Sequence, residues 1–125
     1  MLAFGYKQAS EAPHEGSIMP TNMAKPVPAG RDLLISVKAI SVNPVDTKIR
    51  RTVSPQPDEF KVLGWDAVGI VEQAGQDCSL FKAGDRVFYA GDISRAGSNA
   101  EYQLVDERIV GRAPQRLSDA QAAAL

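Results

Sequence analysis

The sequence predicts a mainly β domain, with the architecture of a partly open β-barrel and only short helices. Six or seven short segments have the composition of strands, and turns that contain glycine or proline separate them. The 125 residues suffice for one compact domain with a hydrophobic core. No internal repeat or low-complexity tract points to another class.

The first half of the chain contains two predicted strands. Residues 1–6 (MLAFGY) form a short strand, and residues 7–30, with four prolines and two glycines, form a loop. Residues 33–42 (LLISVKAISV) are the strongest strand signal, because they are rich in β-branched and other apolar residues. One or two helical turns follow, and residues 52–60 (TVSPQPDEF) form a second loop.

The second half predicts four further strands. Residues 64–75 (GWDAVGIVEQAG) form a strand with internal glycines, which often mark a bend or a close approach of another backbone. Shorter strands are predicted at residues 86–90, after a Gly-Asp turn, and at residues 99–105 and 108–114.

The last eight residues begin as a helix. Ser118 can cap it, and Gln121 three residues later completes the pattern of a capping box. A helix of barely two turns is marginal by itself. We therefore expect the start of a helix that connects to a further domain; the alternative is a C-terminal helix that docks on the sheet.

Composition and charge exclude several function classes. Fourteen basic and fifteen acidic side chains leave a net charge of −1, so nucleic acid is not an expected partner. No apolar run approaches about 20 residues, so no membrane partner is expected either. The N-terminus lacks a basic start followed by an apolar run, so we expect no signal peptide and a cytoplasmic protein.

The chain has one cysteine and one histidine. Cys78 reads as a small residue at a strand end or turn, and His14 as a solvated loop residue. A zinc site built from cysteine and histidine needs three or four ligands, which two such residues cannot supply. A single cysteine also suits a reducing compartment.

A polar group follows the strongest strand. Asn43 is a good helix N-cap, Pro44 suits the first helical position, and Asp46 and Lys48 come just behind. This arrangement has two interpretations. It is either an ordinary strand exit, since Asn and Pro are turn residues for local backbone reasons, or the floor of a functional site.

Five motifs in a fixed order resemble the medium-chain dehydrogenase/reductase superfamily, and most closely its zinc-free quinone oxidoreductase branch, which includes bacterial proteins labelled zinc-type alcohol dehydrogenase-like. The motifs are ISVNPVDTKIR (40–50), LGWDAVGIVEQAG (63–75), FKAGDRVFYAG (81–91), GSNAEYQLVDERIV (97–110) and AAAL (122–125). The resemblance implies that residues 1–125 are the GroES-like catalytic domain. The Rossmann domain that binds NADPH or NADH in the family is expected outside this chain, because no G-x-G occurs in it.

The resemblance also implies the absence of zinc. Zinc-dependent members carry a cysteine ligand where this chain has Asn43, and Gly-His-Glu where it has Gly64-Trp65-Asp66. Tryptophan cannot ligate a metal, and an Asn carbonyl is a poor zinc ligand. The four-cysteine structural zinc lobe is missing as well. We therefore expect no metal site; Asp46 and Asp66 can at most hold a cation weakly.

Without zinc, the resemblance implies hydride transfer from the nicotinamide to a quinone or a conjugated enone, a small-molecule substrate. The Asn43 amide is expected to donate to the substrate carbonyl or to the nicotinamide amide, next to Pro44, and Asp46 belongs to the same candidate catalytic group. Lys48, where several relatives have tyrosine, either stabilises enolate charge or faces solvent.

The remaining candidates line the substrate cleft. They are Trp65 and Asp66, together with Ser98 and Asn99 in a turn that resembles the loop closing the cleft, although any hairpin turn favours such residues.

Three hypotheses for function follow. The first is the catalytic domain of a zinc-independent, NAD(P)H-dependent oxidoreductase, inactive as the 125-residue chain and weak in NADPH binding. The others are a free-standing GroES-like module for binding or oligomerisation, and a zinc-dependent alcohol dehydrogenase. We also expect an exposed apolar patch at residues 122–125 and on part of the barrel, with a homodimer as a possible assembly.

Overall fold

A computed structural model describes residues 1–11 and 17–125 of the chain. His14, predicted to be solvated, lies outside the described residues. No helix in the described part is long and apolar enough to cross a membrane.

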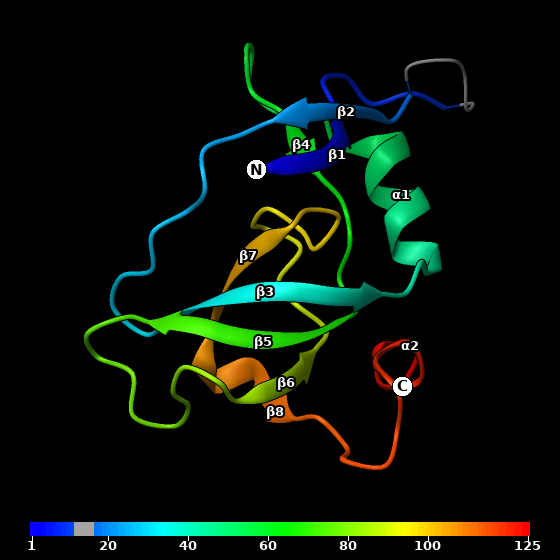
Figure 1. Cartoon of the computed structure of the whole chain (residues 1–125). Coiled ribbons are helices and arrows are strands. Elements are labelled where there is room, and N and C mark those ends of the chain that lie inside the picture. Colours follow the sequence, from blue (N-terminus) through cyan, green and yellow to red (C-terminus); the bar gives the residue numbers. More distant parts are fainter. Residues whose placement is uncertain (12–16) are drawn as a thin grey trace.

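The described residues form two antiparallel sheets and a few short helices (Figure 1). The strands are β1 (Leu2–Tyr6), β2 (Met19–Asn22), β3 (Asp32–Ile40), β4 (Lys61–Val62), β5 (Ala67–Ala74), β6 (Arg86–Tyr89), β7 (Tyr102–Asp106) and β8 (Val110–Arg112). The helices are α1 (Pro44–Thr52), the 3-10 turn η1 (Glu107–Ile109) and α2 (Asp119–Ala123).

The smaller sheet has the strand order β2-β1-β4 and the larger one the order β7-β3-β5-β6-β8. Residues 99–101 connect the two sheets, because the Phe4 N–H donates to Asn99 O (2.7 Å) and the Val37 N–H to Glu101 O (3.0 Å). This connection curls the sheets toward each other, and the predicted mainly β, partly open GroES-like barrel is confirmed.

The internal glycine of β5 behaves as the sequence predicted. Gly69 pairs with Val37 of β3, and a Cβ atom at Gly69 would lie 2.4 Å from the Ser36 carbonyl oxygen. Only glycine permits this approach of two strands.

The main core lies on one face of the larger sheet. Its fully buried residues are apolar apart from one tyrosine: Leu33, Ile35, Ala67, Val71, Val87, Tyr89 and Val105. The Tyr89 hydroxyl donates to Gln103 Oε1 over 2.7 Å, and burial raises the pKa of Tyr89. The prediction of a strand at residues 99–105 was right, but β7 begins only at Tyr102, and its buried face carries Gln103 and Val105.

Several predicted boundaries were wrong. The predicted loop 7–30 contains strand β2, which pairs with β1 over residues 19–22. Residues 64–66 are not part of a strand, since β5 starts at Ala67. The turn η1 occupies the first residues of the strand predicted at 108–114, and α1, with nine residues, is longer than the expected one or two turns.

The capping predictions were correct. Asn43 is the N-cap of α1, with Pro44 in its first turn. In α2, the Gln121 N–H donates to Ser118 Oγ (3.2 Å) and the Ser118 N–H donates to Gln121 Oε1 (2.9 Å), which completes the capping box. Arg86 holds the segment before α2, because its guanidinium donates to Pro114 O (2.8 Å) and Leu117 O (3.0 Å). Helix α2 therefore docks on the sheet and does not depend on its own propensity alone.

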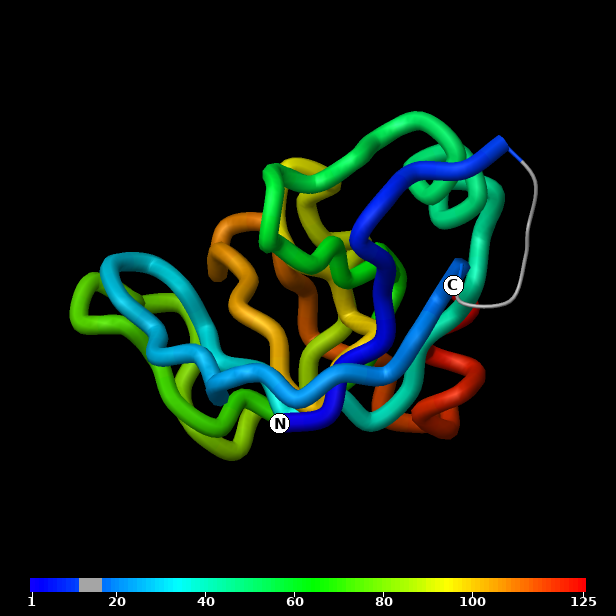
Figure 2. The backbone as a smooth tube through the Cα atoms, turned by 90° about the horizontal axis from the view of Figure 1, so that it is seen from above, coloured from blue at the N-terminus to red at the C-terminus, as the bar shows by residue number. Residues whose placement is uncertain are grey.

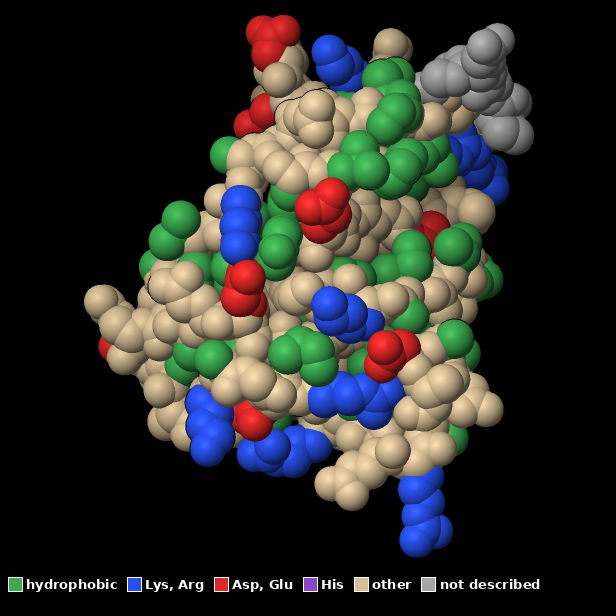
Figure 3. Space-filling view, viewed as in Figure 1, with side chains coloured by type: hydrophobic (Ala, Val, Ile, Leu, Met, Phe, Trp, Pro, Cys, Tyr) green, Lys and Arg blue, Asp and Glu red, His purple; other side chains and the backbone are tan. Residues whose placement is uncertain are grey.

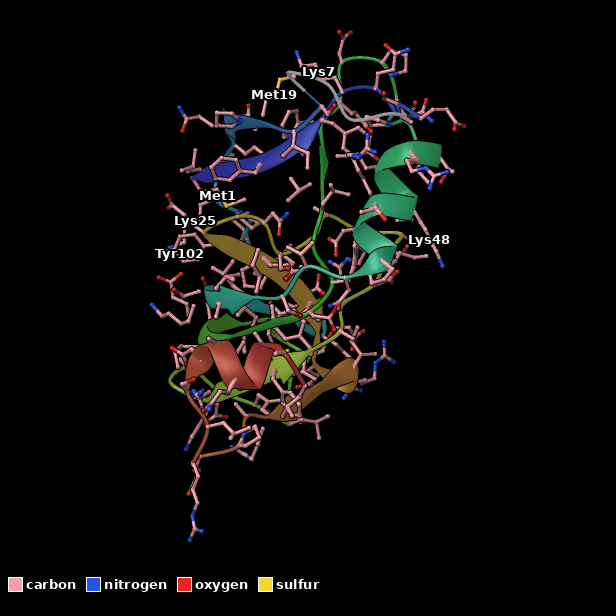
Figure 4. All side chains as sticks on the ribbon, turned by 90° about the vertical axis from the view of Figure 1, so that its right-hand side faces the viewer. Met1, Lys7, Met19, Lys25, Lys48 and Tyr102 are labelled. Atoms are coloured by element: carbon pink, nitrogen blue, oxygen red, sulfur yellow. The ribbon has the colours of Figure 1, made fainter. Side chains whose placement is uncertain are left out.

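The β2–β3 loop and the β5–β6 loop lie side by side at the end of the β3–β5 pair that is far from α1 (Figures 1 and 2). The Asp77 N–H donates to Gly30 O over 2.9 Å, and Cys78 closes a turn onto Gly75, as expected for a turn residue. Lys25 fixes the first loop over the sheet, with its ammonium 2.7 Å from Glu72 and 4.2 Å from the centre of the Tyr102 ring (Figure 4).

Glu107 is a carboxylate with no solvent exposure. It accepts hydrogen bonds from Arg31 Nη2 (2.8 Å), from the Ser79 N–H (3.1 Å) and from the Leu80 N–H (2.9 Å). Burial works against its charge, but the hydrogen bonds from Leu80, Ser79 and Arg31 outweigh it and hold the pKa of Glu107 below its usual value. This side chain joins three segments that are distant in the sequence.

Charges of both signs cover the surface. On the face seen in Figure 3, basic side chains gather over the lower half, and acidic ones lie between them. This mixture agrees with the net charge of −1.

Candidate functional site

The candidate site forms where the end of β3 meets the N-terminus of α1 and the segment Gly64–Asp66. Two local features create it. The strand ends because Asn43 and Pro44 start a helix, and the chain then returns after loop 53–60 so that the Ser41 N–H donates to Asp66 O (3.0 Å). Residues more than 20 positions apart thus become neighbours.

Asn43 uses its side chain within the protein. Its Nδ2 donates to Asp66 Oδ2 over 2.7 Å and to Ser41 Oγ over 3.0 Å. An amide nitrogen has only two hydrogens, so both are occupied. The Asn43 backbone N–H donates to Asp46 Oδ2 (2.8 Å), and the Asn43 side chain faces the Asp46 N–H in a capping box.

The orientation of the Asn43 amide follows from its neighbour. An ionised carboxylate only accepts hydrogen bonds, so the amide nitrogen must face Asp66. The expected donation from Asn43 to a substrate would require one of these two bonds to break. Asn43 therefore links β3, α1 and Asp66. The second carboxylate oxygen, Asp66 Oδ1, has no hydrogen-bond partner among the described residues.

The other candidate site residues on α1 lie in different environments. Asp46 is buried, with 5 % exposure, and its carboxylate serves the helix cap. Pro44 is exposed at the start of α1. Lys48 is exposed as well and points away from the sheets (Figure 4). The structure thus joins Asn43, Asp46 and Asp66, and it does not bring Lys48 to them.

Trp65 is a structural anchor below the site. It is 3 % exposed and packs with Tyr6 and Leu63, while its Nε1–H donates to Asp92 O over 3.0 Å. Lys61 lies 5.5 Å from the centre of its ring and donates to Ile93 O (3.0 Å). Burial lowers the pKa of Lys61, and the nearby Asp92 carboxylate opposes this shift.

The turn at Ser98 and Asn99 lies against Gly64. The Ser98 N–H donates to Gly64 O (2.9 Å) and the Asn99 N–H to Leu63 O (2.8 Å). Ser98 Oγ and Asn99 Oδ1 are buried and have no hydrogen-bond partner among the described residues. A Cβ atom at Gly64 would lie 2.4 Å from Ser98 Oγ and 2.6 Å from Asn99 Oδ1, and the φ of Gly64 is +106°.

Replacing Gly64 by alanine is expected to destabilise the domain more than Gly84→Ala does. Both glycines have positive φ, +106° and +96°, but nothing lies within 4 Å of a Cβ atom at Gly84. The matched pair therefore separates backbone strain, which both variants share, from crowding, which costs about 1–2 kcal/mol at Gly64 alone. Urea unfolding of the two variants measures the difference; equal midpoints would contradict the crowding.

A cavity of about 250 Å³ opens beside Asp66. Its lining is otherwise mainly apolar and comes from β6, from α2 and from single residues of β5, η1 and β8, with Phe88, Tyr89, Ala122 and Leu125 among the residues. Leu125 is 70 % exposed at this edge. The expected apolar patch at residues 122–125 is therefore only partly present, because Ala122 and Ala123 are buried against the sheet.

One contributor to the site was missed by sequence reasoning. The Tyr6 hydroxyl of β1 donates to Ile49 O over 2.9 Å and also to Val53 O, so it holds the C-terminus of α1. Burial raises the pKa of Tyr6, and the Arg50 charge opposes the shift. The sequence gives no signal for this contact, because Tyr6 lies more than 40 residues before Ile49 and Val53.

The donor set does not fit a zinc ion. The Asn43 amide nitrogen donates both of its hydrogens, and the Trp65 indole donates to a carbonyl. Cys78 lies elsewhere, with its Sγ 3.3 Å from Asp32 O at the far end of β3. Within the described ranges, no three His, Cys, Asp or Glu side chains are grouped so that they could hold a metal ion.

The curled antiparallel barrel, with a strand exit and a helix at the edge of a cleft, defines a GroES-like domain. Residues 29–115 match the alcohol dehydrogenase GroES-like domain. The chain belongs to this family, and its homologues are oxidoreductases of the medium-chain dehydrogenase/reductase superfamily.

Relatives carry two kinds of name. A zinc-type alcohol dehydrogenase-like protein of Staphylococcus epidermidis is 45% identical over 125 residues, which are 100% of this chain and 37% of the relative. The human quinone oxidoreductase is 41% identical over 106 residues, which are 84% of this chain and 32% of the relative. The chain thus spans about a third of the length of these relatives.

The solved structures that resemble this chain carry the same two kinds of name. A protein from Rhizobium etli CFN 42 that carries the name zinc-dependent alcohol dehydrogenase superimposes with a TM-score of 0.96 at 54% identity, over 100% of this chain and 36% of that one. The Escherichia coli quinone oxidoreductase, solved in complex with NADPH, superimposes with a TM-score of 0.84 at 29% identity, over 99% of this chain and 36% of that one.

Proposed function

We propose that residues 1–125 are the N-terminal catalytic domain of a cytoplasmic, zinc-independent, NAD(P)H-dependent oxidoreductase that reduces quinones or conjugated enones. The NAD(P)-binding Rossmann domain then belongs to the remainder of the polypeptide. The observation that carries the proposal is the Asn43–Asp66 hydrogen bond of 2.7 Å, which links the strand exit to the edge of a mainly apolar cavity without a set of metal ligands.

The cofactor supplies the hydride when it is bound, and a conjugated acceptor needs no Lewis acid to receive it. The residues of this chain have three tasks. Apolar groups such as Phe88 and Leu125 contact a flat substrate and exclude water. Asn43 fixes the carboxylate of Asp66, and Asp66 Oδ1 would accept a hydrogen bond from an N–H of the nicotinamide carboxamide or from an O–H of the reduced quinone. We assign no role to Lys48, which faces away.

The test is turnover by the full-length protein. Benzoquinone and cyclohexenone are offered with NADPH and, separately, with NADH, and cofactor oxidation is followed by absorbance. We expect turnover that a chelator does not change. Turnover of a simple secondary alcohol with NADP⁺ that the chelator abolishes would overturn the proposal in favour of a zinc-dependent alcohol dehydrogenase. Turnover of no substrate by a properly folded full-length protein would favour the binding or oligomerisation module.

We expect the purified 125-residue chain to hold no stoichiometric zinc after dialysis. The reason is the donor set, in which Asn43 and Trp65 act as hydrogen-bond donors. Elemental analysis of the dialysed protein measures this, with a chelator-treated sample as control. A content near one zinc per chain would contradict it and would agree with the zinc-type names of the relatives.

A further inference from the structure

The Ser41 hydroxyl lies beside the proposed active site and is only half engaged. Ser41 is partly exposed just after β3, and its Oγ accepts a hydrogen bond from Asn43 Nδ2 over 3.0 Å. A hydroxyl group can both accept and donate. The hydrogen of the Ser41 hydroxyl has no acceptor among the described residues, so it is available to a ligand.

Ser41 and Asp66 lie on the face of the sheet that α2 covers. The strand register pairs Ala39 with Val68, and both pack in the cluster that contains the buried alanines of α2. The Ser41 N–H donates to Asp66 O (3.0 Å), which continues this pairing two residues further along each strand. Side chains alternate along a strand, so Ser41 and Asp66 are on the same face as that cluster. Because Asp66 lines the cavity, the Ser41 hydroxyl lies next to it.

The other side-chain donors considered for the site are engaged or point elsewhere. Asn43 uses both amide hydrogens within the protein. The Tyr89 hydroxyl, in the cavity wall, donates to Gln103 Oε1 over 2.7 Å. Lys48 of α1 points away from the sheets (Figure 4). Ser41 is therefore the donor that this arrangement offers to a substrate.

A donor at this place matches the charge that the proposed reaction creates. When a hydride adds to the β-carbon of a conjugated enone, the π electrons move to the carbonyl oxygen, which becomes an enolate oxygen. Hydride transfer to a quinone likewise leaves negative charge on an oxygen. A hydroxyl group that donates to this oxygen stabilises the charge. The hydrogen bond that Ser41 accepts from Asn43 makes its hydroxyl a stronger donor, because hydrogen bonds in a chain polarise one another.

We propose that Ser41 is a catalytic residue whose hydroxyl donates a hydrogen bond to the carbonyl oxygen of the conjugated substrate. This inference rests on the proposed function. The hydride and its two electrons come from NAD(P)H, which is oxidised, and the substrate is reduced. Water supplies the proton that completes the product, at the α-carbon of the enolate or at the oxygen of the reduced quinone, and Ser41 keeps its own proton. Asn43 is a positioning residue, because its amide orients the Ser41 hydroxyl.

Steady-state kinetics of the full-length protein tests the assignment, with cyclohexenone or, if the parent reduces only the quinone, with benzoquinone. Ser41→Ala is expected to lower kcat about a hundredfold, as for the loss of one donor to a developing oxyanion, and to leave the KM for NAD(P)H unchanged. Ser41→Thr keeps the hydroxyl and should retain kcat within about threefold of the parent. Ser36→Ala is the matched control and should leave kcat unchanged, because Ser36 is a partly exposed serine of β3 that does not line the cavity.

A second readout does not depend on turnover. The same substrate is bound to full-length protein saturated with the oxidised cofactor, which cannot donate a hydride, and its carbonyl stretching frequency is measured by isotope-edited infrared spectroscopy. A hydrogen bond to the carbonyl oxygen lowers this frequency. We expect the lowered frequency in the parent, in Ser36→Ala and in Ser41→Thr, and its loss in Ser41→Ala. A merely structural role of Ser41 would not change the frequency.

Thermal melting shows whether each variant is folded. If Ser41→Ala does not fold, Ser41→Cys takes its place, because a thiol has a similar size and is only a weak donor. Turnover by the tested variant within about threefold of the parent, or an unchanged carbonyl frequency, would overturn the role of Ser41 and leave the proposed function standing. A loss of kcat that Ser41→Thr does not restore would make Ser41 a structural partner of Asn43 and would overturn its role as well. A full-length parent that reduces neither substrate would overturn the proposed function, and the assignment of Ser41 with it.

Discussion

Replacing Glu107 by glutamine is expected to lower the urea midpoint of unfolding by roughly 1–3 M, because the change breaks an ion pair whose carboxylate is buried. The carboxylate has no solvent exposure and accepts from Arg31, Ser79 and Leu80. Glutamine has nearly the same shape, but its NH₂ group is a donor that faces donors. The one remaining carbonyl oxygen cannot replace both carboxylate oxygens, so either Arg31 or the Leu80 N–H loses its acceptor, and the Arg31 charge loses its counter-charge.

Glu59→Gln is the matched control, because Glu59 is exposed. It should leave the midpoint almost unchanged. If Glu107→Gln shifts the midpoint no more than Glu59→Gln does, Glu107 is not the link between its three segments.

The same variant gives a pH test. The folded pKa of Glu107 lies below its unfolded value, so its contribution to stability is complete above the unfolded pKa and is lost as the pH falls through the folded pKa. Below about pH 4.5 the parent should therefore lose stability more steeply than Glu107→Gln. Asp92 and Asp106, whose pKa values are also lowered, are present in both proteins, so the difference between the two curves isolates Glu107.

Asn43→Asp in the full-length enzyme is expected to reduce kcat/KM for a quinone or enone roughly tenfold to a hundredfold. The new carboxylate replaces the Nδ2 that donates to Asp66 Oδ2 (2.7 Å) and to Ser41 Oγ (3.0 Å). Two carboxylates then face each other, and both Asp66 and the strand exit lose their positions. Steady-state kinetics measures the loss, and thermal melting shows how much of it reflects stability.

The double variant Asn43→Asp, Asp66→Asn is the control. It reverses the hydrogen bond, so that an amide at position 66 donates to a carboxylate at position 43. If Asp66 itself accepts from substrate or cofactor, the swap restores the melting temperature but not turnover. Restoration of both would reduce the pair to a structural link. A single Asn43→Asp variant with turnover within about threefold of the parent would remove Asn43 from the site.

Local chemistry explains which elements the sequence predicted well. Residues 33–42 alternate and are β-branched, so β3 was clear, and the caps at Asn43 and Ser118 depend on side chains within three residues of them. Strand β2 was missed because Pro20 and the polar residues around it resemble a loop. Its four residues form a strand only because β1 offers a pairing edge.

The candidate site was likewise predicted only in part. The resemblance selected Asn43, Trp65, Asp66, Ser98 and Asn99, and the structure brings this set to neighbouring segments. The sequence could not show that the Asn43 amide is already occupied, since its partner Asp66 is 23 residues away and reaches it only after loop 53–60 returns. For the same reason, Lys48 looked like a site residue, although the helix turns it to solvent.

By itself the sequence determined the mainly β class, the strand exit at Asn43, the two helix caps and the lack of a Cys/His zinc set, because each depends on residue type or on contacts between near neighbours. Only the tertiary structure decided the burial of Glu107 between three segments and the closure of Ser98 and Asn99 onto Gly64. These features depend on contacts between residues far apart in the chain. Such contacts form only when the sheet brings the strands together, and no local pattern in the sequence encodes them.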